Sequence, residues 1–586
     1  MPRDLVTQAF LGVDSSLTGR LWAGPSVEED RKAEALVQET GLPDALCRIL
    51  ALRGVAGPDC AAHLEPKLRD LMPDPRSLKD MEIASARLLK AATGRERVAI
   101  FADYDVDGAT SAAVLHDWFA AHGLTPTIYV PDRIAEGYGP NAPAMEKLAA
   151  GHDLIVCVDC GTLAHEALEA AAMTDVVVLD HHLGGETLPR AVAVVNPNRQ
   201  DESGALAHLC AAAVCFLAVV EANRQARGAG HPAPDPVPLL DLVALATVAD
   251  VAPLIGVNRA FVRAGLAVMH RRARPGLAAL ADEAGLSEAP AAYHLGYMLG
   301  PRINAGGRIG RADLGARLLT TRDGPEAQSL AEKLNALNGE RRDIEARVTE
   351  EATEQAIARG ADAPLVWASG DGWHPGVVGI VASRLKEAFG RPAVVIGTDG
   401  GIGKGSGRSV SGIDLGAAVH RLSREGLLIA GGGHKMAAGL TADADRIEAA
   451  MERLSELLEA QGSGSGAARQ LRLDGLMMPG AATVEMIEAL ESAGPFGASA
   501  PAPRFAIPGA AIHAARRVGD GHLKLTVSDG LGPRLDAIAF GVFRSDLGPA
   551  LEAHGGARFH LAGRFEINSW NGRRSAQLRL EDAAKA

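Results

Sequence analysis

Residues 98–115, VAIFADYDVDGATSAAVL, decide the fold of this chain. The apolar run from Val98 to Phe101 predicts a buried strand, Gly108 breaks it, and the residues from Ala109 onward predict a helix. Between strand and helix stand three aspartates at every second position: Asp103, Asp105 and Asp107. Three carboxylates so close together repel one another unless a cation lies among them, which indicates a site for a hard metal ion. The alternative is an Asp-rich turn that only faces solvent.

Four more strand-like runs follow, separated by helical segments: PTIYV, DLIVCVD, DVVVLD and AVAVVN, within residues 126–196. Continuous apolar strands alternating with helices are typical of a parallel sheet covered on both faces, so we expect an α/β domain. Two of these strands also end in metal-binding residue types, Asp159 in one case and Asp180, His181 and His182 in the other. The carboxyl ends of parallel strands meet at the sheet edge where ligands bind, so these side chains are expected beside the first three aspartates.

Composition limits the class of protein. The chain has 586 residues, enough for three or four domains, and a net charge of −13, which disfavours anion binding over the whole surface. Residues 501–586 carry a local balance of +4. Six cysteines are too few for a disulfide framework and fit a reducing cytoplasm. The start, MPRDLVTQAF, lacks the features of a signal peptide, and we expect no contact with a membrane.

The chain divides into five parts by pattern. Residues 1–90 predict an N-terminal helical segment, 91–323 the first α/β domain, 324–360 a long connecting helix, 361–462 a smaller second α/β domain, and 470–586 a small β-barrel of the oligonucleotide-binding (OB) type. A Gly/Ser-rich linker at 461–469 separates the last two domains. Within the first domain, the apolar run 205–220 predicts a buried helix.

Several weaker motifs leave alternatives open. Cys157 and Cys160 form a CxxC, but strand alternation would point the two thiols to opposite faces, so we interpret them as packing residues. The segment GGIGKGS resembles a phosphate-binding P-loop only superficially. Thr398 stands where the first glycine of that motif belongs, and Gly405 stands where Ser or Thr is required, so an ATPase is a weak hypothesis. Asp250 ends an apolar helix and is either a cap or a metal ligand.

Basic and aromatic residues of the later chain suit a nucleic acid. In 299–315, LGPRINAGGRIGRADLG, Arg302 and Arg308 lie among glycines, where guanidinium groups can pair with phosphate oxygens, although a solvated basic loop has the same pattern. His374, the loop GKGSGRSVSG with Ser406 and Arg408, and GGGHKMAAGL with His434 could contact a phosphate backbone. In the barrel, Trp570 beside a predicted turn is the aromatic residue best placed to stack on bases.

In this order, DYDVDG, VDCG, DHH and the Asp250 segment TVADVAPL resemble the four motifs of the DHH phosphoesterase superfamily. GPRINAGGR, WHPGVVGIVASRL, GRSVSGIDL, GGHKMAAGL, GPFG and EINSW resemble the RecJ single-stranded-DNA exonucleases. The resemblance identifies 91–323 as a DHH catalytic domain and 361–462 as the DHH-associated domain.

The resemblance also implies site residues. It places two Mn²⁺ or Mg²⁺ ions on Asp105, Asp107, Asp159, His181 and Asp250, with Asp103 and His182 beside them as catalytic residues. Phe101 departs from the pattern, because some superfamily members carry a metal-binding histidine there. The DNA contacts that we expect are Arg133, Arg302, Asn304, Arg308, Ser406, Arg408, His434 and Trp570.

The leading hypothesis is a processive 5′-to-3′ exonuclease that degrades single-stranded DNA to mononucleotides by two-metal hydrolysis, in DNA repair and recombination. Its expected partners are single-stranded DNA, a single-stranded-DNA-binding protein and a repair helicase. One rival is a small-substrate phosphodiesterase for short oligoribonucleotides or cyclic dinucleotides, which the extra barrel disfavours. Another is a non-catalytic replication scaffold, which the presence of every expected acid disfavours.

Overall fold

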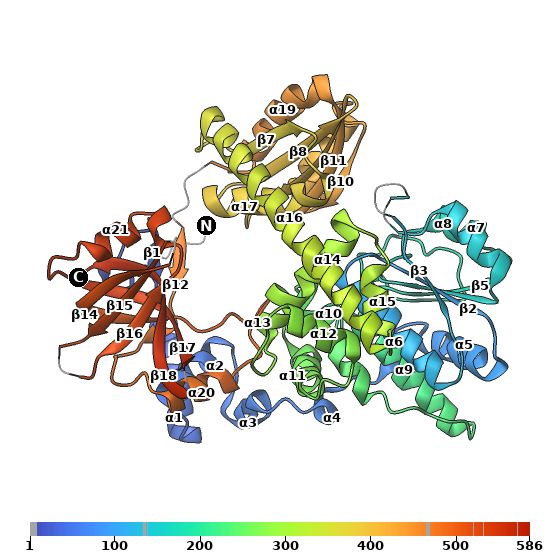
Figure 1. The fold of residues 1–586 in the computed structure, drawn as a ribbon, viewed down its shortest axis with the longest axis horizontal. Helices are drawn as coiled ribbons and strands as arrows, with labels where there is room; N and C mark the ends of the chain where they lie inside the picture. The colour runs from blue at the N-terminus through green and yellow to red at the C-terminus, as the bar shows by residue number, and fades with distance from the viewer. Residues whose placement is uncertain are drawn as a thin grey trace.

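The chain forms three lobes, a first α/β lobe, a second α/β lobe and a β-barrel (Figure 1). This computed structural model describes residues 9–132, 136–137, 139–464, 469–519, 521–530, 532–570 and 572–586. Of the expected linker at 461–469, residues 465–468 lie outside this part. Among the described residues, no helix is long and apolar enough to cross a membrane.

The sheet of the first lobe is entirely parallel, as expected, with the order β3-β2-β4-β5-β6. Its strands are β2 (Val98–Ala102), β3 (Thr127–Tyr129), β4 (Leu154–Val158), β5 (Asp175–Leu179) and β6 (Ala193–Val195). The chain winds outward from β2 to β3 on one side and to β4, β5 and β6 on the other. In such a sheet, ligands bind at the carboxyl ends of the two strands where the order reverses, here β2 and β4.

Alternate strand residues face two different cores. Val98, Ile100 and Ala102 of β2 face a large core with α5 (Met81–Gly94), α6 (Val106–Ala121), α9 (Ala211–Gly228) and α10 (Leu240–Ala249). Ala99 and Phe101 face a smaller core with α7 (Ala142–Gly151) and α8 (His165–Ala170). Both faces of the sheet are therefore covered, which explains the unbroken apolar runs in the sequence. The lobe is completed by α11 (Gly256–His270), α12 (Pro275–Glu283), α13 (Ala292–His294), a π-helical turn (Leu295–Leu299), α14 (Gly300–Ile309) and α15 (Leu314–Thr320).

Cys157 and Cys160 both lie in the smaller core, so the expectation that they face opposite sides of the sheet is wrong. Strand alternation stops at Val158, where β4 ends, and Asp159 then turns the chain with a φ of 59°. Both thiols are buried and free, in agreement with a packing role.

The predicted connecting helix is α16 (Gly324–Arg359). Its 36 residues make it about 54 Å long. Leu330 and Leu334 near its start pack in the core of the first lobe, whereas Val348 and Ala352 near its end pack in the second lobe. One rigid helix therefore fixes the distance between the two lobes.

The second lobe is a mixed sheet in the order β10-β11-β9-β8-β7 with helices on both faces. Its strands are β7 (Val366–Asp371), β8 (Ala393–Asp399), β9 (Ile402–Arg408), β10 (Ala430–His434) and β11 (Ala437–Asp443). Its helices are α17 (Pro375–Phe389), α18 (Leu415–Arg424) and α19 (Ile447–Glu459).

The expected C-terminal barrel is present. Five strands close in the order β14-β15-β16-β18-β17 and back to β14, with only the β16–β18 pair parallel. These strands are β14 (Phe505–Val518), β15 (His522–Ser528), β16 (Leu535–Ala539), β17 (Arg558–Trp570) and β18 (Arg573–Lys585). Strand β13 (Gly475–Leu476) extends β14, and α20 (Val484–Ser492) and α21 (Leu547–Glu552) complete the lobe.

The N-terminal helical segment does not behave as one unit. Helices α1 (Val27–Thr40) and α2 (Asp44–Leu52) share a core with the barrel, and β1 (Leu21–Ala23) pairs with β12 (Gln470–Arg472). The indole of Trp22 donates a hydrogen bond of 3.0 Å to Asp582 in β18. Helices α3 (Cys60–Leu64) and α4 (Leu68–Leu71) lead back to the first lobe, where α5 is part of the core. The barrel is therefore built from both ends of the chain.

Candidate metal centre and phosphate pocket

The three aspartates after β2 are held by the first turn of α6. Asp105 caps this helix, because its Oδ1 accepts hydrogen bonds from the N–H groups of Asp107 and Gly108 at 2.9 and 3.1 Å. A Cβ at position 108 would lie 2.3 Å from the backbone oxygen of Asp103, so only glycine lets the helix start so close to the strand end. The DxDxDG pattern therefore makes a tight turn that brings three carboxylates together.

Asp107 is fixed by the start of a second helix. Its Oδ2 accepts a hydrogen bond from Ala211 N–H at 2.7 Å and its Oδ1 from Ala212 N–H at 2.8 Å, both in the first turn of α9. The positive end of a helix dipole favours a carboxylate at this place. Even so, burial raises the pKa of Asp107 above its ordinary value. Each of its oxygens keeps a lone pair for another partner, such as a metal ion.

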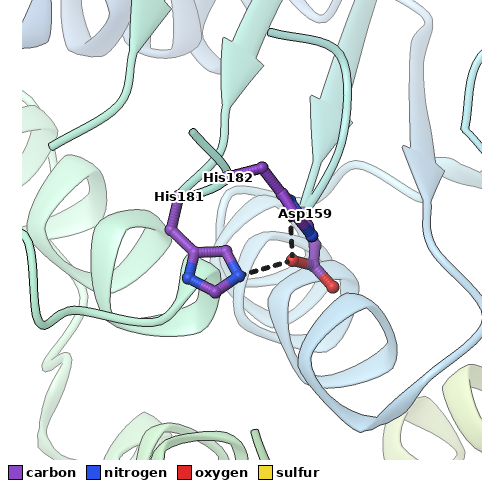
Figure 2. Close-up of side chains that lie close together, drawn as sticks. All are labelled: Asp159, His181 and His182. Atoms are coloured by element: carbon purple, nitrogen blue, oxygen red, sulfur yellow. Dashed lines mark ion pairs between the residues drawn. The ribbon is translucent and has the colours of Figure 1, made fainter. Parts of the chain in front are cut away.

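Asp159 follows β4 and meets the two histidines that follow β5 (Figure 2). Its Oδ1 lies 3.3 Å from His181 Nε2 and 3.9 Å from His182 Nδ1. This oxygen is buried and accepts no hydrogen bond from any described residue. Burial, together with the charges of Asp107, Asp105 and Asp103, raises the pKa of Asp159 well above its ordinary value. A cation would relieve this cost directly, because it supplies the missing partner and offsets the repulsion.

Asp250 completes the cluster from the end of α10. Its Oδ2 lies 3.9 Å from His181 Nε2, and His181 Nε2 is also 3.7 Å from Asp107 Oδ2. Burial and the charges of Asp107 and Asp105 raise the pKa of Asp250 to about 8. Of its two alternatives, cap or ligand, the structure places it among the other expected ligands.

Three overlapping groups in the described chain could hold a metal ion, each with its ligand atoms within 4.8 Å of one another. They are Asp107, His181 and Asp250; Asp103, Asp105 and Asp159; and Asp159, His181 and His182. The all-carboxylate group suits Mn²⁺ or Mg²⁺, and carboxylate oxygens with one or two imidazoles form a donor set that Mn²⁺ accepts. All seven residues expected here are thus brought together, and Asp103 belongs to the second group together with Asp105.

Asp180 is a residue of this site that had no role assigned from the sequence. It is buried, and its Oδ1 accepts hydrogen bonds from His181 N–H at 2.7 Å, His182 N–H at 3.1 Å and His182 Nδ1 at 2.8 Å. Burial alone would raise the pKa of Asp180, but its hydrogen bond with His182 holds the pKa well below the ordinary value. In return, Asp180 outweighs the effect of burial on His182 and raises the pKa of that imidazole to about 9. The signal in the sequence was the acid directly before the histidine pair.

Two asparagines after β6 hold the backbone of the same turn. Asn196 Nδ2 donates to the carbonyl oxygen of His182 at 2.8 Å, and Asn198 Nδ2 donates to that of His181 at 2.6 Å. The histidine pair is thus fixed from both its side-chain and its backbone atoms.

Phe101, where some relatives carry a histidine, does not face the cluster. It is fully buried in the smaller core and stacks on Tyr129, with ring centroids 5.5 Å apart. Its role is packing, and the second imidazole of the cluster comes from His182.

Helix α14 connects this cluster to the second lobe. Asn304 Oδ1 accepts a hydrogen bond of 3.0 Å from Val106 N–H, between Asp105 and Asp107. One turn later, Arg308 Nη1 donates to the carbonyl oxygen of Gly376 in α17 at 3.1 Å. Asn304 and Arg308 are therefore about 6 Å apart along the helix. Asn304 supports the aspartate turn, a role the sequence did not indicate.

Arg308, Ser406 and Arg408 line one pocket of about 370 Å³ at the junction of the two lobes. The segment expected as a loop is strand β9, in which Gly403, Gly405 and Gly407 face the core because any Cβ there would lie within 2.8 Å of Ile447, Ile396 or Leu415. Lys404, Ser406 and Arg408 alternate with these glycines and face the pocket. The P-loop hypothesis is wrong, because the glycines belong to a strand. Lys404 is a pocket residue that the sequence motifs did not single out.

The remaining expected DNA contacts are less closely grouped. Arg302 donates to Met298 O at 2.7 Å and to Asn335 Oδ1 at 3.0 Å, which ties α14 to α16. His434 is exposed at the end of β10, next to Gly433 of the pocket. Trp570 ends strand β17, but its side chain lies outside the described residues, and so does Arg133.

Comparison with known proteins first defines the class. The chain matches the DHH family, N-terminal domain, over residues 97–247, the DHHA1 domain over 362–460, and the RecJ OB domain over 473–582. It is thus a DHH protein with a DHHA1 domain and an OB domain.

Full-length relatives give the family. The chain is 38% identical over 567 residues to the single-stranded-DNA-specific exonuclease RecJ of Dickeya dadantii, covering 93% of this chain and 97% of the relative. It is 36% identical to RecJ of Escherichia coli, covering 92% and 96%. The structure of RecJ from Thermus thermophilus in complex with Mn²⁺ superposes with a TM-score of 0.79 at 29% identity, covering 96% of this chain and 79% of that one. The chain therefore belongs to the RecJ family.

Proposed function

We propose that this protein is an exonuclease that degrades single-stranded DNA from the 5′ end to mononucleotides by metal-dependent phosphodiester hydrolysis. One observation carries the proposal: Asn304 of α14 holds the turn that carries the carboxylate–imidazole cluster, and Arg308, one helical turn further along α14, lines a basic pocket. This arrangement pairs a site for cutting a phosphodiester with a site for a second phosphate.

Two divalent ions, Mn²⁺ or Mg²⁺, are the proposed cofactors, since RecJ of T. thermophilus was crystallised in complex with each. Asp107, His181 and Asp250 would hold one ion, and Asp103, Asp105 and Asp159 the other. When bound, such a pair lowers the pKa of water and offsets charge on the scissile phosphate. Asp103 is thereby proposed as a ligand as well as a catalytic residue.

His182 is the proposed donor to the substrate. Asp180 favours its protonated form, and its side chain is the more exposed of the two cluster histidines, at 43% compared with 17% for His181. A protonated imidazole can donate a hydrogen bond to a scissile phosphate oxygen or a proton to the leaving oxygen.

The phosphate pocket accounts for the proposed direction of digestion. Arg308, Lys404 and Arg408 supply positive charge, Ser406 supplies a hydroxyl, and the N-terminus of α17 lines one side. A terminal 5′ phosphate held there would place the next phosphodiester at the carboxylate cluster. The OB-type barrel supports an unpaired strand as the substrate, because this fold commonly binds single strands.

We also propose the expected setting. Six buried, free cysteines fit a reducing cytoplasm. The family relationship supports a role in DNA repair and recombination together with a helicase and a single-stranded-DNA-binding protein.

Digestion of strands labelled at either end, with and without Mn²⁺, tests the proposal. We expect loss of the 5′ label first, release of mononucleotides, and no digestion in a chelator. Preferred cutting of dinucleotides or cyclic dinucleotides over long strands would favour the small-substrate phosphodiesterase. Purified protein that stays inert on 5′-phosphorylated strands with Mn²⁺ at several pH values would favour the scaffold.

A further inference from the structure

The proposed ligand Asp250 is followed by a residue in an unusual backbone conformation. Helix α10 ends at Asp250 in a cap that glycine usually completes. In this cap, Val251 N–H donates to Val248 O at 3.2 Å. Ala252 N–H donates back to Thr247 O at 3.0 Å. The residue that makes the turn is Val251, with a φ of 58°, and this left-handed conformation is strained for a side chain that branches at Cβ. Asp250 thus stands at a strained helix end.

The side chain of Val251 gains little from packing that could offset the strain. It is 69% exposed, although it is apolar. A strained backbone conformation persists only where the surrounding structure holds it in place. The support for Val251 must therefore come from contacts made by the chain on either side of it.

The chain is held again at Leu254, and here the contact comes from the barrel lobe. Leu254 N–H donates to Ala498 O at 2.8 Å, and the Leu254 side chain is buried in a small core that includes Ala500. A Cβ at Gly497 would lie 2.8 Å from Cδ1 of Leu254, so the two backbones pack closely. The turn 497–500 therefore holds Leu254 by its backbone and by its side chain. We call this contact the clasp.

The clasp is firm on both sides. In the barrel lobe, Gly497 and Ala500 exchange backbone hydrogen bonds of 2.9 and 3.1 Å. In the first lobe, Asn258 Nδ2 donates to Pro253 O at 3.0 Å, next to the clasp. Three residues separate Asp250 from the clasp, too few to absorb a displacement without a change in the strained backbone between them. The contact between two lobes is thereby connected to a carboxylate of the metal cluster.

We propose that docking of the barrel lobe, through the clasp, holds Val251 in its left-handed conformation and so positions Asp250 for a metal ion. Val251 and Leu254 are then positioning residues. When the clasp opens, Val251 relaxes, the end of α10 rearranges, and Asp250 moves away from Asp107 and His181, the residues with which it forms a group. Metal binding and barrel docking therefore favour each other, because such coupling is reciprocal. The inference rests on the metal site of the proposed function and extends it to the contact between two lobes.

The test opens the clasp from the barrel side and measures Mn²⁺ binding to the whole chain by the EPR signal of free Mn²⁺. Gly497→Val places a branched side chain against Leu254 and changes no residue of the first lobe. Val251→Gly keeps the left-handed turn without the strain. Arg95→Gly is the matched control, because Arg95 is an exposed residue with a φ of 53° at the end of α5, before β2 begins.

We expect Gly497→Val to raise the Kd of one Mn²⁺ ion roughly 5- to 30-fold, the equivalent of the penalty for one left-handed residue. The same change should have no effect in a Val251→Gly background, where no strain needs support. It should have none in an Asp250→Asn background, where the coupled carboxylate is absent. Arg95→Gly should bind Mn²⁺ like the wild type. Saturating Mn²⁺ compensates for the weaker binding, so turnover of a dinucleotide by Gly497→Val should then match the wild type.

Hydrogen exchange measures the same coupling in the other direction. Mn²⁺ should slow exchange of the Leu254 amide roughly 5- to 30-fold in the wild type. This slowing is counted beyond that of the Val366 amide, which is bonded at 2.9 Å to Pro392 O within the second lobe and reports any global stabilisation. Neither Val251→Gly nor Asp250→Asn should show the additional slowing.

Leu254→Ala opens the same contact from the first lobe. Mn²⁺ binding by the wild type with an unchanged Kd in both Gly497→Val and Leu254→Ala would overturn the coupling and leave the proposed function standing. A rise in Kd that persists in the Val251→Gly background would also overturn it, because the clasp would then act without the strained turn. A wild type that binds no Mn²⁺ would remove the metal site of the proposed function and this inference with it.

Discussion

The Nδ1 atom of His182 lies 2.8 Å from the Oδ1 atom of Asp180, and Asp180 is buried against the same turn that supplies His181 to the metal cluster. One carboxylate therefore orients both histidines, through the backbone N–H groups of both and through the ring of one. Asp180 therefore sets both the orientation of the two histidines and the protonation of His182.

Asp180→Asn should move the alkaline limit of activity. In the wild type, the pKa of His182 is raised from 6.5 to about 9, so the imidazole keeps its proton through neutral pH and loses it only as the pH rises through about 9. Without the negative charge, the pKa falls toward the ordinary value, and at pH 8 only about one imidazole in thirty stays protonated. We expect roughly a 30-fold loss of kcat at pH 8 and a much smaller loss at pH 6.

The pH profile of kcat, measured at saturating Mn²⁺, checks this prediction. His182→Gln is the matched control, since it removes the proton donor and should give a low, flat profile in the same range. A profile of Asp180→Asn that runs parallel to the wild type at a lower level would mean that Asp180 acts only by holding the turn.

Asp250→Asn should stabilise the metal-free protein and destabilise the metal-bound one. Because burial and nearby carboxylates raise the pKa of Asp250 from 3.8 to about 8, its ionised form is less favourable in the folded protein than in the unfolded chain. The free energy of unfolding contributed by this group therefore falls as pH rises from about 4 through about 8. Asparagine removes this unfavourable ionisation but also removes a carboxylate ligand of the proposed metal site.

Thermal unfolding in a chelator and in Mn²⁺ checks whether the order of stability of the wild type and Asp250→Asn reverses when the metal binds. In the chelator at pH 9, the variant should have the higher Tm, and the difference should shrink toward pH 5. In Mn²⁺, the Tm of the wild type should rise more than the Tm of the variant. Asp445→Asn, an exposed position outside the site, should follow the wild type in every condition. The same order of Tm values with and without Mn²⁺ would show that Asp250 holds no ion.

Arg408→Ala should weaken the hold on the 5′ end. This residue shares the pocket with Arg308 and Lys404, and its Nη1 donates to Ser406 Oγ at 2.8 Å. Loss of a charged hydrogen bond to phosphate should raise Kd for a 5′-phosphorylated strand by about 10- to 100-fold. The slope of log Kd against log salt should become shallower by about one unit.

Binding of 5′-phosphate and 5′-hydroxyl strands to the Asp105→Asn protein, with and without Arg408→Ala, separates the contributions. The two strands should bind the Arg408→Ala protein almost equally. Arg421→Ala, an exposed arginine paired with Glu425, should keep the wild-type preference. An unchanged salt slope would count against a phosphate contact by Arg408.

The sequence predicted the metal cluster because its parts are local. Apart from Asp250, which ends helix α10, each acid or histidine lies within a few residues of the end of an apolar strand, and parallel topology alone brings Asp107, Asp159 and His181 to one edge. The roles of Asp180, Asn196 and Asn304 could not be predicted, since they depend on which backbone groups meet across separate turns.

Long-range packing limited other predictions. The glycines of β9 suggested a loop, but they face a core whose tight fit is visible only in three dimensions. The apolar run 205–220 suggested a helix from Ala205, yet α9 begins at Ala211, where its first N–H groups bind Asp107. The N-terminal helices looked like one segment, although α1 and α2 share a core with a barrel more than 400 residues away. Removing the barrel would expose that core, so point variants test the barrel better than truncation.

Arg259→Met should loosen the barrel from the first lobe. Arg259 is buried in α11, and its Nη2 donates to the carbonyl oxygens of His63, Ala493 and Gly494. The last two residues directly precede residues 495–498, and Leu254 N–H donates to Ala498 O at 2.8 Å in the same junction. Burial also lowers the pKa of Arg259 to about 10, so keeping this guanidinium charged inside the folded protein is unfavourable. Replacing Arg259 by Met removes that unfavourable charge, which offsets part of the stability lost with the hydrogen bonds.

The global Tm of Arg259→Met should therefore change little, whereas the junction should open. Hydrogen exchange of the Leu254 amide and of residues 493–500 should become at least about tenfold faster, since each lost charged hydrogen bond corresponds to roughly 1.5–3 kcal/mol. KM for long strands should rise while turnover of a dinucleotide at saturating Mn²⁺ is kept, because the barrel lobe moves relative to the first lobe and the metal-bound cluster does not. Arg271→Met, at the exposed C-terminal cap of the same helix, serves as the control. Unchanged exchange at Leu254 in Arg259→Met would show that apolar contacts around Leu254 and Ala500 hold the junction without the arginine.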